Sequence, residues 1–540
     1  MLFTTLKGYT RQQFIKDVVS GLIVAIIALP LSIALALASG VGPEKGIYTA
    51  IVAGFVISFL GGSTVQISGP TAAFATIVAG IVAKNGFEGL VIATILAGII
   101  LILMGVFRFG TLIKFIPSPI ATGFTAGIAV TIVIGQLKDF FGLTYPAGLS
   151  PVETMEKLHA VFSNFSSINL WAVVVGLISL AILIVWPMVC KKIPIPASLI
   201  AVLAGIVLAR FLPVNTIGDL YTITSDLPKP NLPAFSFETI RTVLPDAFTI
   251  AVLAAIESLL SCVVADGMTG TRHRSNMELV AQGAGNIASA LFGGIPATGA
   301  IARTAANINN GGRTPIAGMV HALVLLLILV VLMPYAALIP MSTIAAILFM
   351  VAYNMCQWRP FVRQVRTAPK SDVAVLLVTF FLTVIFDLVI AIEFGMLLAA
   401  ILLIKRMSER ADVHSWRYTE EENDPDHIAL REVPLHVRVY EISGPMFFGA
   451  ADRLSAIRTK DFTKVLILRM RGVPSLDFTA MSALEELFER CRKKGVTLIL
   501  SHVNEQPMNV MQRAGFVEKV GQENFCEHID EALARANELK

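Results

Sequence analysis

Long apolar stretches separated by short polar ones dominate the first 410 residues of the chain. A bilayer core takes roughly 20 apolar residues as a helix, so the pattern predicts two sets of seven membrane spans. The first set covers residues 17–38, 47–62, 70–83, 88–108, 115–137, 169–187 and 196–213. The second covers residues 243–266, 278–292, 299–309, 314–334, 339–355, 371–388 and 389–405. We therefore predict an α-helical membrane domain at residues 17–410, with repeats at 17–213 and 243–405.

Two of the predicted spans, 70–83 and 299–309, are too short to cross a bilayer alone, and each is the third of its set. Their entrances are alike: Ser68-Gly69-Pro70-Thr71-Ala72-Ala73 precedes one, and Gly293–Ala300 precedes the other. A repeat of seven spans must invert the second half, so the two helix N-termini would face each other. Unpaired N–H groups and positive dipole ends form an anion site, and such paired short segments mark transporter sites. The alternative is two kinked helices.

Three polar residues lie inside the apolar segments around this predicted site. Glu257 lies well within the eighth span, where a carboxylate is costly unless paired, hydrated or protonated, and Ser261 follows it one turn later. We interpret Glu257 as a proton carrier, the alternative being a static tie between helices. Arg303 lies in the tenth span and can hold a carboxylate or sulfate with two hydrogen bonds. The alternative is that Arg303 only pairs with Glu257.

Charge and composition predict the orientation of the chain in the membrane and exclude several classes of protein. The chain is 55% hydrophobic and 15% charged, which excludes a purely soluble protein. With a cytoplasmic N-terminal segment (1–16), the inner side receives seventeen Lys and Arg residues and the outer side seven. That segment has no cleavage site, so we expect no removable signal peptide. The small net charge of +4 indicates no nucleic-acid partner. Five scattered cysteines and no catalytic motif predict neither a metal site, a cofactor nor an enzyme.

The composition changes after residue 410. Residues 411–540 hold 17 Lys and Arg against 21 Asp and Glu, a net charge of −4. We predict a linker at 411–426 and a cytoplasmic α/β domain at 427–540. Its most informative segment is a loop that runs into a helix, in which Asp477 is a natural N-cap. Thr479 is a candidate phosphorylation site, because a phosphate there would meet the helix dipole.

Several motifs resemble those of the SulP (sulfate permease) anion transporters, which carry a C-terminal STAS domain. The motifs are Ile67–Ala73, Arg108-Phe109-Gly110, Phe115-Ile116-Pro117, Gly123–Gly127, Gln136–Phe140, Ala265–Thr271 and Gly293–Thr304. Within that family the chain looks most like the bacterial C4-dicarboxylate uptake branch, a similarity that rests on Ala255–Thr271 and Ile295–Asn307. The resemblance implies a homodimer, an elevator-like movement of a core against a gate, and a STAS loop at Asp477 and Thr479 that is a regulatory site. It implies these substrate-binding residues: Thr71, Ala72, Ala73, Thr298, Gly299, Ala300, Ile301 and Arg303. It also matches Glu257 and Ser261 to a proton-coupling or cation position.

Together these features predict a multi-pass transporter of the bacterial inner membrane with both termini in the cytoplasm. The expected activity is import of succinate, fumarate or aspartate with protons. The close alternative is a sulfate or bicarbonate importer of the same fold. A nucleobase–proton symporter shares the seven-plus-seven plan, but Arg303 and the STAS domain argue against it. A further alternative is a membrane-tethered signalling protein whose STAS domain contacts a cytoplasmic partner.

Overall fold

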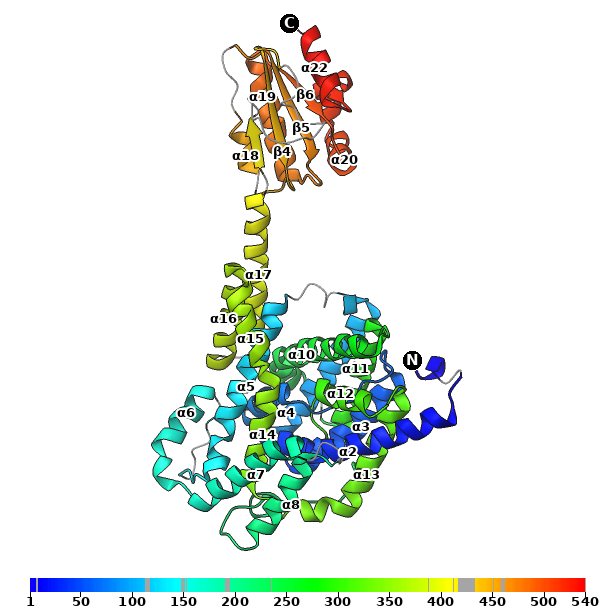
Figure 1. Cartoon of the computed structure of the whole chain (residues 1–540), viewed down its shortest axis with the longest axis vertical. Coiled ribbons are helices and arrows are strands. Elements are labelled where there is room, and N and C mark those ends of the chain that lie inside the picture. Colours follow the sequence, from blue (N-terminus) through cyan, green and yellow to red (C-terminus); the bar gives the residue numbers. More distant parts are fainter. Residues whose placement is uncertain are drawn as a thin grey trace. The chain divides into compact units, whose positions relative to one another are not determined.

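The structure, a computed structural model, describes residues 1–5, 8–111, 117–146, 151, 153–189, 195–234, 236–386, 388–410, 412–415, 433–449, 451–457 and 462–539. The chain divides into two compact units, Met1–Met396 and Leu397–Lys540 (Figure 1). The division falls inside helix α17, earlier than the predicted end of the membrane domain at residue 410. Each unit is described by itself.

The first unit is helical, and its elements follow the two predicted repeats. The part of the unit before residue 237 holds α1 (Leu2–Thr5), α2 (Arg11–Ala38), α3 (Pro43–Leu60), β1 (Ser68–Gly69), α4 (Ala72–Val106), α5 (Ser118–Phe141), α6 (Thr154–Ser163), α7 (Leu170–Val189), α8 (Ala197–Ala209) and α9 (Ile217–Leu220). Of these, α1 and α9 lie outside the predicted repeat one at 17–213. Repeat two holds α10 (Phe237–Thr269), α11 (Ser275–Leu291), β2 (Thr298–Gly299), α12 (Ile301–Asn309), α13 (Pro315–Ala336), α14 (Met341–Cys356), α15 (Trp358–Thr367), α16 (Lys370–Ile385) and α17 (Leu388–Arg410). Among the described residues, eight helices are long and apolar enough to cross a membrane.

Every one of the fourteen predicted spans coincides with a helix or part of one. The third and fourth spans are the two parts of α4, which is interrupted at Gly86, whose φ of +67° only glycine adopts readily. Four described helices of the first unit lie outside the predicted spans. Helices α1 and α9 have only four residues each, and α6 and α15 have 10 residues each and are too polar to span a bilayer. Residues 112–116, 190–194 and Asp387, which border predicted spans, lie outside the described part of the chain.

Packing divides the first unit into two groups of helices. In one, α4 packs against α10 and α11, and α13 packs against α2 and α3. In the other, α5 packs against α14 and α16, and α7 packs against α8 and α14 (Figure 1). The first group comes from the first four spans of each repeat and the second from later spans. They correspond to the core and the gate that the family resemblance implies.

Glycines permit a close helix contact in the core. A Cβ on Gly98 of α4 would lie 2.7 Å from the carbonyl oxygen of Gly283 on α11. Small residues let helix backbones approach in this way where lipid provides no hydrophobic driving force between helices. The pairing of α4 with α11 fixes the segment that precedes α4 beside repeat two.

The second unit contains a five-stranded sheet in the order β3-β4-β5-β6-β7. Its strands are β3 (Asp412–Ser415), β4 (Val437–Ser443), β5 (Val465–Gly472), β6 (Thr497–Ser501) and β7 (Phe525–Cys526), and only β3 runs antiparallel to its neighbour. Its helices are α18 (Ala451–Ser455), α19 (Phe478–Lys493), α20 (Glu505–Arg513), α21 (Phe516–Val520) and α22 (Ile529–Glu538). Strand β3 occupies part of the predicted linker, and residues 416–432, which hold the rest of that linker, lie outside the described residues.

Alternate residues of the central strands build two cores, one on each face of the sheet. Leu466 and Leu468 of β5 join the core that contains α19, whereas Val465 and Ile467 join the core that contains α22. This is the two-residue period of a strand buried on both faces. The second unit is therefore the compact α/β domain that its alternating pattern predicts.

Candidate functional site

Two short strands bring the interrupted helices of the two repeats together. β1 pairs antiparallel with β2, with Ser68 opposite Gly299 and Gly69 opposite Thr298. The Ala300 N–H extends the pair by donating to the Ile67 carbonyl at 2.9 Å. Since α4 begins at Ala72 and α12 at Ile301, both helix N-termini lie within three residues of this strand pair. The structure thus produces the juxtaposition that the matched Gly/Pro segments predict.

Neither helix start is capped by the side chain of its N-cap residue. Ala300 has no capping group, and Thr71 makes no capping hydrogen bond. The Thr71 hydroxyl instead donates to Oε2 of Glu257 at 2.9 Å. Glu257 and Thr71 are both half-buried, so the pair lies at the edge of the site and is not enclosed in the protein interior. The first N–H groups of a helix have no partner within it, and they stay available to an anion.

Arg303 adds a positive charge beside these helix starts. Its side chain is 1% exposed, and Nη2 donates to the carbonyl oxygen of Pro70 at the entrance of α4. Nη1 lies beside Gly69, where a Cβ would be only 2.6 Å away. Nη1 and Nε have no hydrogen-bond partner within the described part of the chain. A buried guanidinium with two unused donors is equipped to hold an oxyanion.

The proposed pairing of Arg303 with Glu257 is not formed in this structure. No ion pair joins them among the described residues, since Glu257 accepts from Thr71 and Arg303 donates to Pro70. Ser261 does not accompany Glu257 at the site either, because its hydroxyl is buried and points to Thr304 of α12 at 3.5 Å. Ser261 therefore joins α10 to α12 here.

The remaining predicted site residues divide into buried and open positions. Thr298 is fully buried and bonds to the Ser258 hydroxyl at 2.6 Å, and the Gly299 N–H donates to the same hydroxyl at 3.1 Å. Ala72, Ala73 and Ala300 are buried, whereas Ile301 is 37% exposed. The exposed side of the site at the starts of α4 and α12 is thus bordered by Ile301, Thr71 and Glu257.

Glu278 is the central residue that the sequence analysis missed. Its carboxylate is fully buried and accepts four hydrogen bonds, two at each oxygen. Oε2 accepts from the N–H groups of Gly62 at 2.8 Å and Ser63 at 3.2 Å. Oε1 accepts from the side-chain amides of Gln66 and Gln282, each at 2.9 Å. Glu278 of repeat two therefore fixes the segment that leads into β1 and α4.

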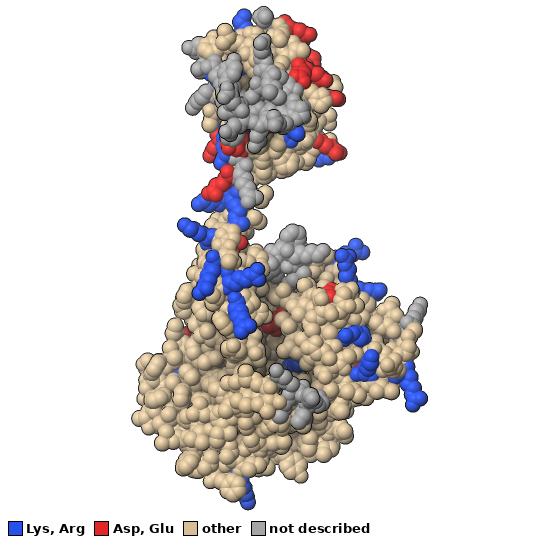
Figure 2. All heavy atoms as spheres, viewed as in Figure 1, with Lys and Arg blue, Asp and Glu red and all other residues tan. Residues whose placement is uncertain are grey.

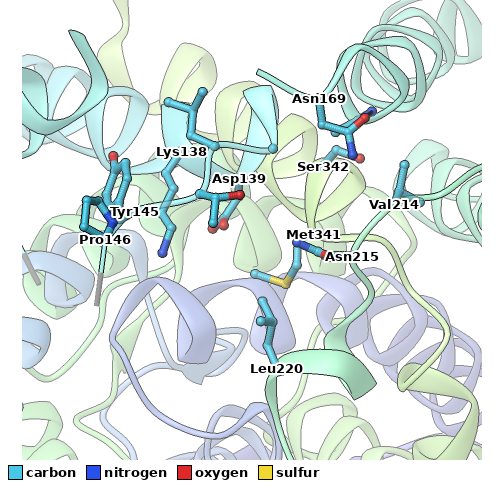
Figure 3. Close-up of a pocket in the computed structure, with 14 residues that line it drawn as sticks. Lys138, Asp139, Tyr145, Pro146, Asn169, Val214, Asn215, Leu220, Met341 and Ser342 are labelled. Carbon is cyan, nitrogen blue, oxygen red and sulfur yellow. Dashed lines mark hydrogen bonds between the residues drawn. The ribbon is translucent and has the colours of Figure 1, made fainter. Parts of the chain in front are cut away.

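Three neighbouring cavities lie along α5 and its surroundings. One of about 450 Å³ is lined by Ala75, Thr76 and Ala79 of α4 and reaches Asp139 of α5. It shares Thr76 and Thr131 with a second cavity of about 590 Å³. A third, of about 260 Å³, is lined by Lys138, Asp139, Asn169, Asn215 and Ser342 (Figure 3). The first cavity begins one turn beyond Ala72, at the boundary between core and gate.

The predicted regulatory loop of the second unit is ordered by Asp477. Its carboxylate caps α19 by accepting from the Ala480 N–H at 2.8 Å, as predicted, and accepts from the Phe448 N–H at 2.9 Å. Thr479 is exposed in the first turn of α19. Its hydroxyl is therefore accessible to a modifying enzyme.

Comparison with known proteins decides the family. The model of the sulfate permease family matches residues 14–379, and that of the STAS domain matches residues 428–532. The chain belongs to the sulfate permease family. Its second unit contains the STAS domain, and the chain as a whole is a multi-pass membrane anion transporter and not an enzyme.

Relatives in this family cover nearly the whole chain. YvdB of Bacillus subtilis, a candidate sulfate transporter, is 41% identical over 536 residues, which covers 97% of this chain and 98% of the relative. The bicarbonate transporter BicA of Picosynechococcus is 31% identical over 541 residues, which covers 96% of this chain and 94% of the relative. Neither is named as a dicarboxylate transporter, so the expected dicarboxylate branch stays a proposal.

Solved structures support the same fold. The transmembrane domain of a cyanobacterial BicA matches with a TM-score of 0.63 at 29% identity, over 72% of this chain and 98% of that one. Murine Slc26a9 in its inward-facing state matches with a TM-score of 0.89 over 99% of this chain and 93% of that one. Its identity of 19% makes it a likeness of fold alone.

Proposed function

We propose that this transporter imports a small oxyanion, sulfate or bicarbonate, at the paired helix starts of α4 and α12. The observation that carries the proposal is Arg303, whose two unused guanidinium nitrogens lie beside Gly69 at the entrance of α4. A buried positive charge next to two helix N-termini favours an anion with several oxygen acceptors. The sulfate and bicarbonate transport named for YvdB and BicA supports the same substrate class.

A C4-dicarboxylate such as succinate, fumarate or aspartate is the second candidate. It offers Arg303 the planar two-oxygen acceptor that a guanidinium holds best. Its second carboxylate would need a donor on the open side of the site, where Thr71 is half-buried and Ile301 exposed. Sulfate and bicarbonate need no second group there, and we rank them first for this reason.

Glu257 is the proposed proton carrier. Its carboxylate borders the site and is tied to the N-cap of α4 through the Thr71 hydroxyl. Protonation would remove a negative charge close to the anion, which makes substrate binding and proton binding mutually favourable. In this scheme Ser261 supports α12 through Thr304 rather than binding the proton.

Access to the site follows the boundary between core and gate. We assign the cavities at Thr76 and Thr131 to the outer side, the side that the distribution of basic residues gives to Lys84, Lys138 and Lys157. Both termini are then cytoplasmic, in the inner membrane of a bacterium. Alternating access would move the core, with its helix starts, past the gate in a homodimer.

The first experiment is uptake of labelled sulfate, bicarbonate and succinate into proteoliposomes, each with and without an inward proton gradient. Gradient-driven uptake of sulfate or bicarbonate supports the first candidate, and uptake of succinate alone supports the second. Absence of uptake of all three anions by folded protein contradicts the proposed site. Succinate competition against labelled sulfate then ranks the two substrates.

Two variants separate substrate binding from proton coupling. Arg303→Lys keeps the charge but loses the planar pair of donors, and we expect the KM to rise about tenfold to a hundredfold. Glu257→Gln keeps an acceptor for Thr71, and we expect counterflow to persist while the proton gradient no longer accelerates uptake. The exposed Glu238→Gln, in the first turn of α10, is the matched control for both measurements. Unchanged pH dependence in Glu257→Gln would exclude its role as carrier.

Crosslinking tests the elevator movement. Thr76 of α4 and Thr131 of α5 line the same two cavities, one from the core and one from the gate. A flexible bifunctional maleimide joining Thr76→Cys to Thr131→Cys in a cysteine-free background should stop counterflow, and either cysteine alone should leave most of it. Full counterflow in the crosslinked protein would contradict relative movement at this boundary.

Thr479 is the proposed regulatory position of the STAS domain. A phosphate on this exposed first-turn residue would add charge at the N-terminus of α19, next to the Asp477 cap. Thr479→Glu should change uptake if the domain regulates transport. A change in binding of a cytoplasmic protein with unchanged uptake would favour a signalling role of the domain instead.

A further inference from the structure

Helix α15 has three differently built faces. It follows α14 through Gln357, which adopts a left-handed φ of +44°, and precedes α16. On its inner face Gln364 donates to the Ser118 hydroxyl of α5 at 2.9 Å, and the Phe361 ring lies 5.5 Å from the Phe380 ring of α16. These contacts fix how the helix is rotated, so the other two faces point away from the gate.

The second face is uniformly basic. Arg359, Arg363 and Arg366 are spaced four and three residues apart, so they fall within an arc of about 60° on a helix of 3.6 residues per turn. All three side chains are exposed. Within the described residues none of them forms an ion pair, and α15 itself contains no Asp or Glu. Figure 2 shows Lys and Arg side chains gathered where Figure 1 labels α15 and α16.

The third face is apolar and lies next to the basic one. Trp358 and Val365 are 46% and 38% exposed. The Trp358 indole N–H donates to the hydroxyl of the exposed Tyr353 at 3.2 Å, and the Arg359 guanidinium lies 5.6 Å from the centre of the Trp358 ring. Tryptophan and tyrosine gather at the level of the lipid headgroups because one end is apolar and the other polar.

We propose that α15 is an interfacial helix that binds the headgroups of anionic phospholipids. Its place between two membrane helices puts it at the membrane surface, on the cytoplasmic side by the distribution of basic residues. There the apolar face of Trp358 and Val365 contacts acyl chains, and the arc of Arg359, Arg363 and Arg366 contacts lipid phosphates. Because α15 packs on α5 and α16, the bound lipid is part of the surroundings of the gate.

The test uses the tryptophan of this helix as the probe. Full-length protein with Trp358 as its single tryptophan, the other three replaced by Phe, is placed in phosphatidylcholine nanodiscs. Equal small fractions of brominated phosphatidylglycerol or brominated phosphatidylcholine are then added, and quenching of Trp358 is measured. We expect brominated phosphatidylglycerol to quench Trp358 at a severalfold lower fraction than brominated phosphatidylcholine, since the attraction of each basic residue to an anionic lipid surface corresponds to a factor of about five.

Three variants identify the cause of the preference. In the triple variant Arg359→Gln/Arg363→Gln/Arg366→Gln, both brominated lipids should quench Trp358 equally. The corresponding triple Lys variant should keep the preference for phosphatidylglycerol. Arg272→Gln/Arg274→Gln, a basic pair in the loop between α10 and α11, is the matched control and should also keep it. Equal quenching by both lipids in the unaltered helix overturns the proposal. Absence of quenching by either lipid overturns it too and shows that a protein surface covers α15.

Discussion

Replacement of Glu278 provides the most direct test of how the site is held in place. The carboxylate accepts two backbone N–H groups at Oε2 and two side-chain amides at Oε1, all buried. Glu278→Ala leaves four buried donors without an acceptor. Each unsatisfied buried donor costs about 1–3 kcal/mol, so for four donors we expect a loss of roughly 4–12 kcal/mol. A loss of this size approaches the whole stability of an ordinary domain.

Glu278→Gln should cost less, because the network contains one amide that can turn over. Turning the Gln282 amide lets its oxygen accept from the new NH₂ group. The turn costs the hydrogen bond that the Gln282 nitrogen donates to the Ser68 hydroxyl at 3.2 Å, whereas the Gln282 oxygen has no partner to lose among the described residues. Gln66 cannot flip as cheaply, since its oxygen already accepts from the Cys262 thiol. We therefore expect Glu278→Gln to lose about 2–3 kcal/mol, mainly at Gln66.

The assay is the temperature at which detergent-purified protein loses its monodisperse size-exclusion peak. The unaltered protein and Glu238→Ala should share the highest melting temperature. Glu278→Gln should melt at a lower temperature, and Glu278→Ala at the lowest. Glu238 is an exposed carboxylate in the first turn of α10, so its removal controls for loss of charge. If Glu278→Ala melts with Glu238→Ala, the network does not hold the entrance of α4 and the reasoning fails.

Three further outcomes follow from local geometry. Gly69→Ala places a Cβ 2.6 Å from Nη1 of Arg303, so anion uptake should fall about tenfold or more while Gly267→Ala, with open space around it, leaves uptake unchanged. Asp477→Ala removes the cap of α19 and should destabilise that helix by about 1 kcal/mol, measured as faster amide exchange in its first turn. Burial raises the pKa of the Cys491 thiol, so an alkylating reagent should modify Cys491 in the folded protein far more slowly than it modifies a free thiol at neutral pH. Modification at the rate of a free thiol would show that the core around α19 opens.

The apolar pattern predicts the helices well because length and hydropathy decide which segments can cross a bilayer. It also predicts that the starts of α4 and α12 meet, since two matching Gly/Pro segments stand at equivalent positions of the two repeats. The pairing of β1 with β2 that joins these starts was not predicted. The pattern misses residues whose partners come from distant sequence. Glu278 is the first residue of a predicted span and gives no local sign of its four donors. His273 is a second example, because its ring lies 2.7 Å from the Asp266 carboxylate and its side chain is 9% exposed.

Helix α15 was missed for a different reason. Its 10 residues include three arginines, so a search for apolar spans passes over it. The angular separation of its basic, apolar and packed faces becomes meaningful only once Gln364 and Phe361 fix its rotation against α5 and α16. The helical period predicts which residues of α15 share a face, and the contacts with α5 and α16 determine which face packs against the gate and which faces point away from it.

In the proposed transport cycle, the distribution of buried polar bonds favours movement of the core as one body. The segment before α4 is held by repeat two, through Glu278, Arg303 and Asn307, which donates to the Val65 carbonyl at 2.8 Å. The segment before α12 is held in turn by Thr49 of repeat one, which accepts from the Ile295 N–H at 2.7 Å. Each repeat thus satisfies backbone groups that the interruption of a helix leaves unpaired in the other, as a membrane interior requires. Separating the two helix starts would break several such bonds at once, whereas cavities line the boundary between α4 and α5. In the proposed alternating access, movement at that boundary would therefore cost least, with the helix starts and Arg303 carried together.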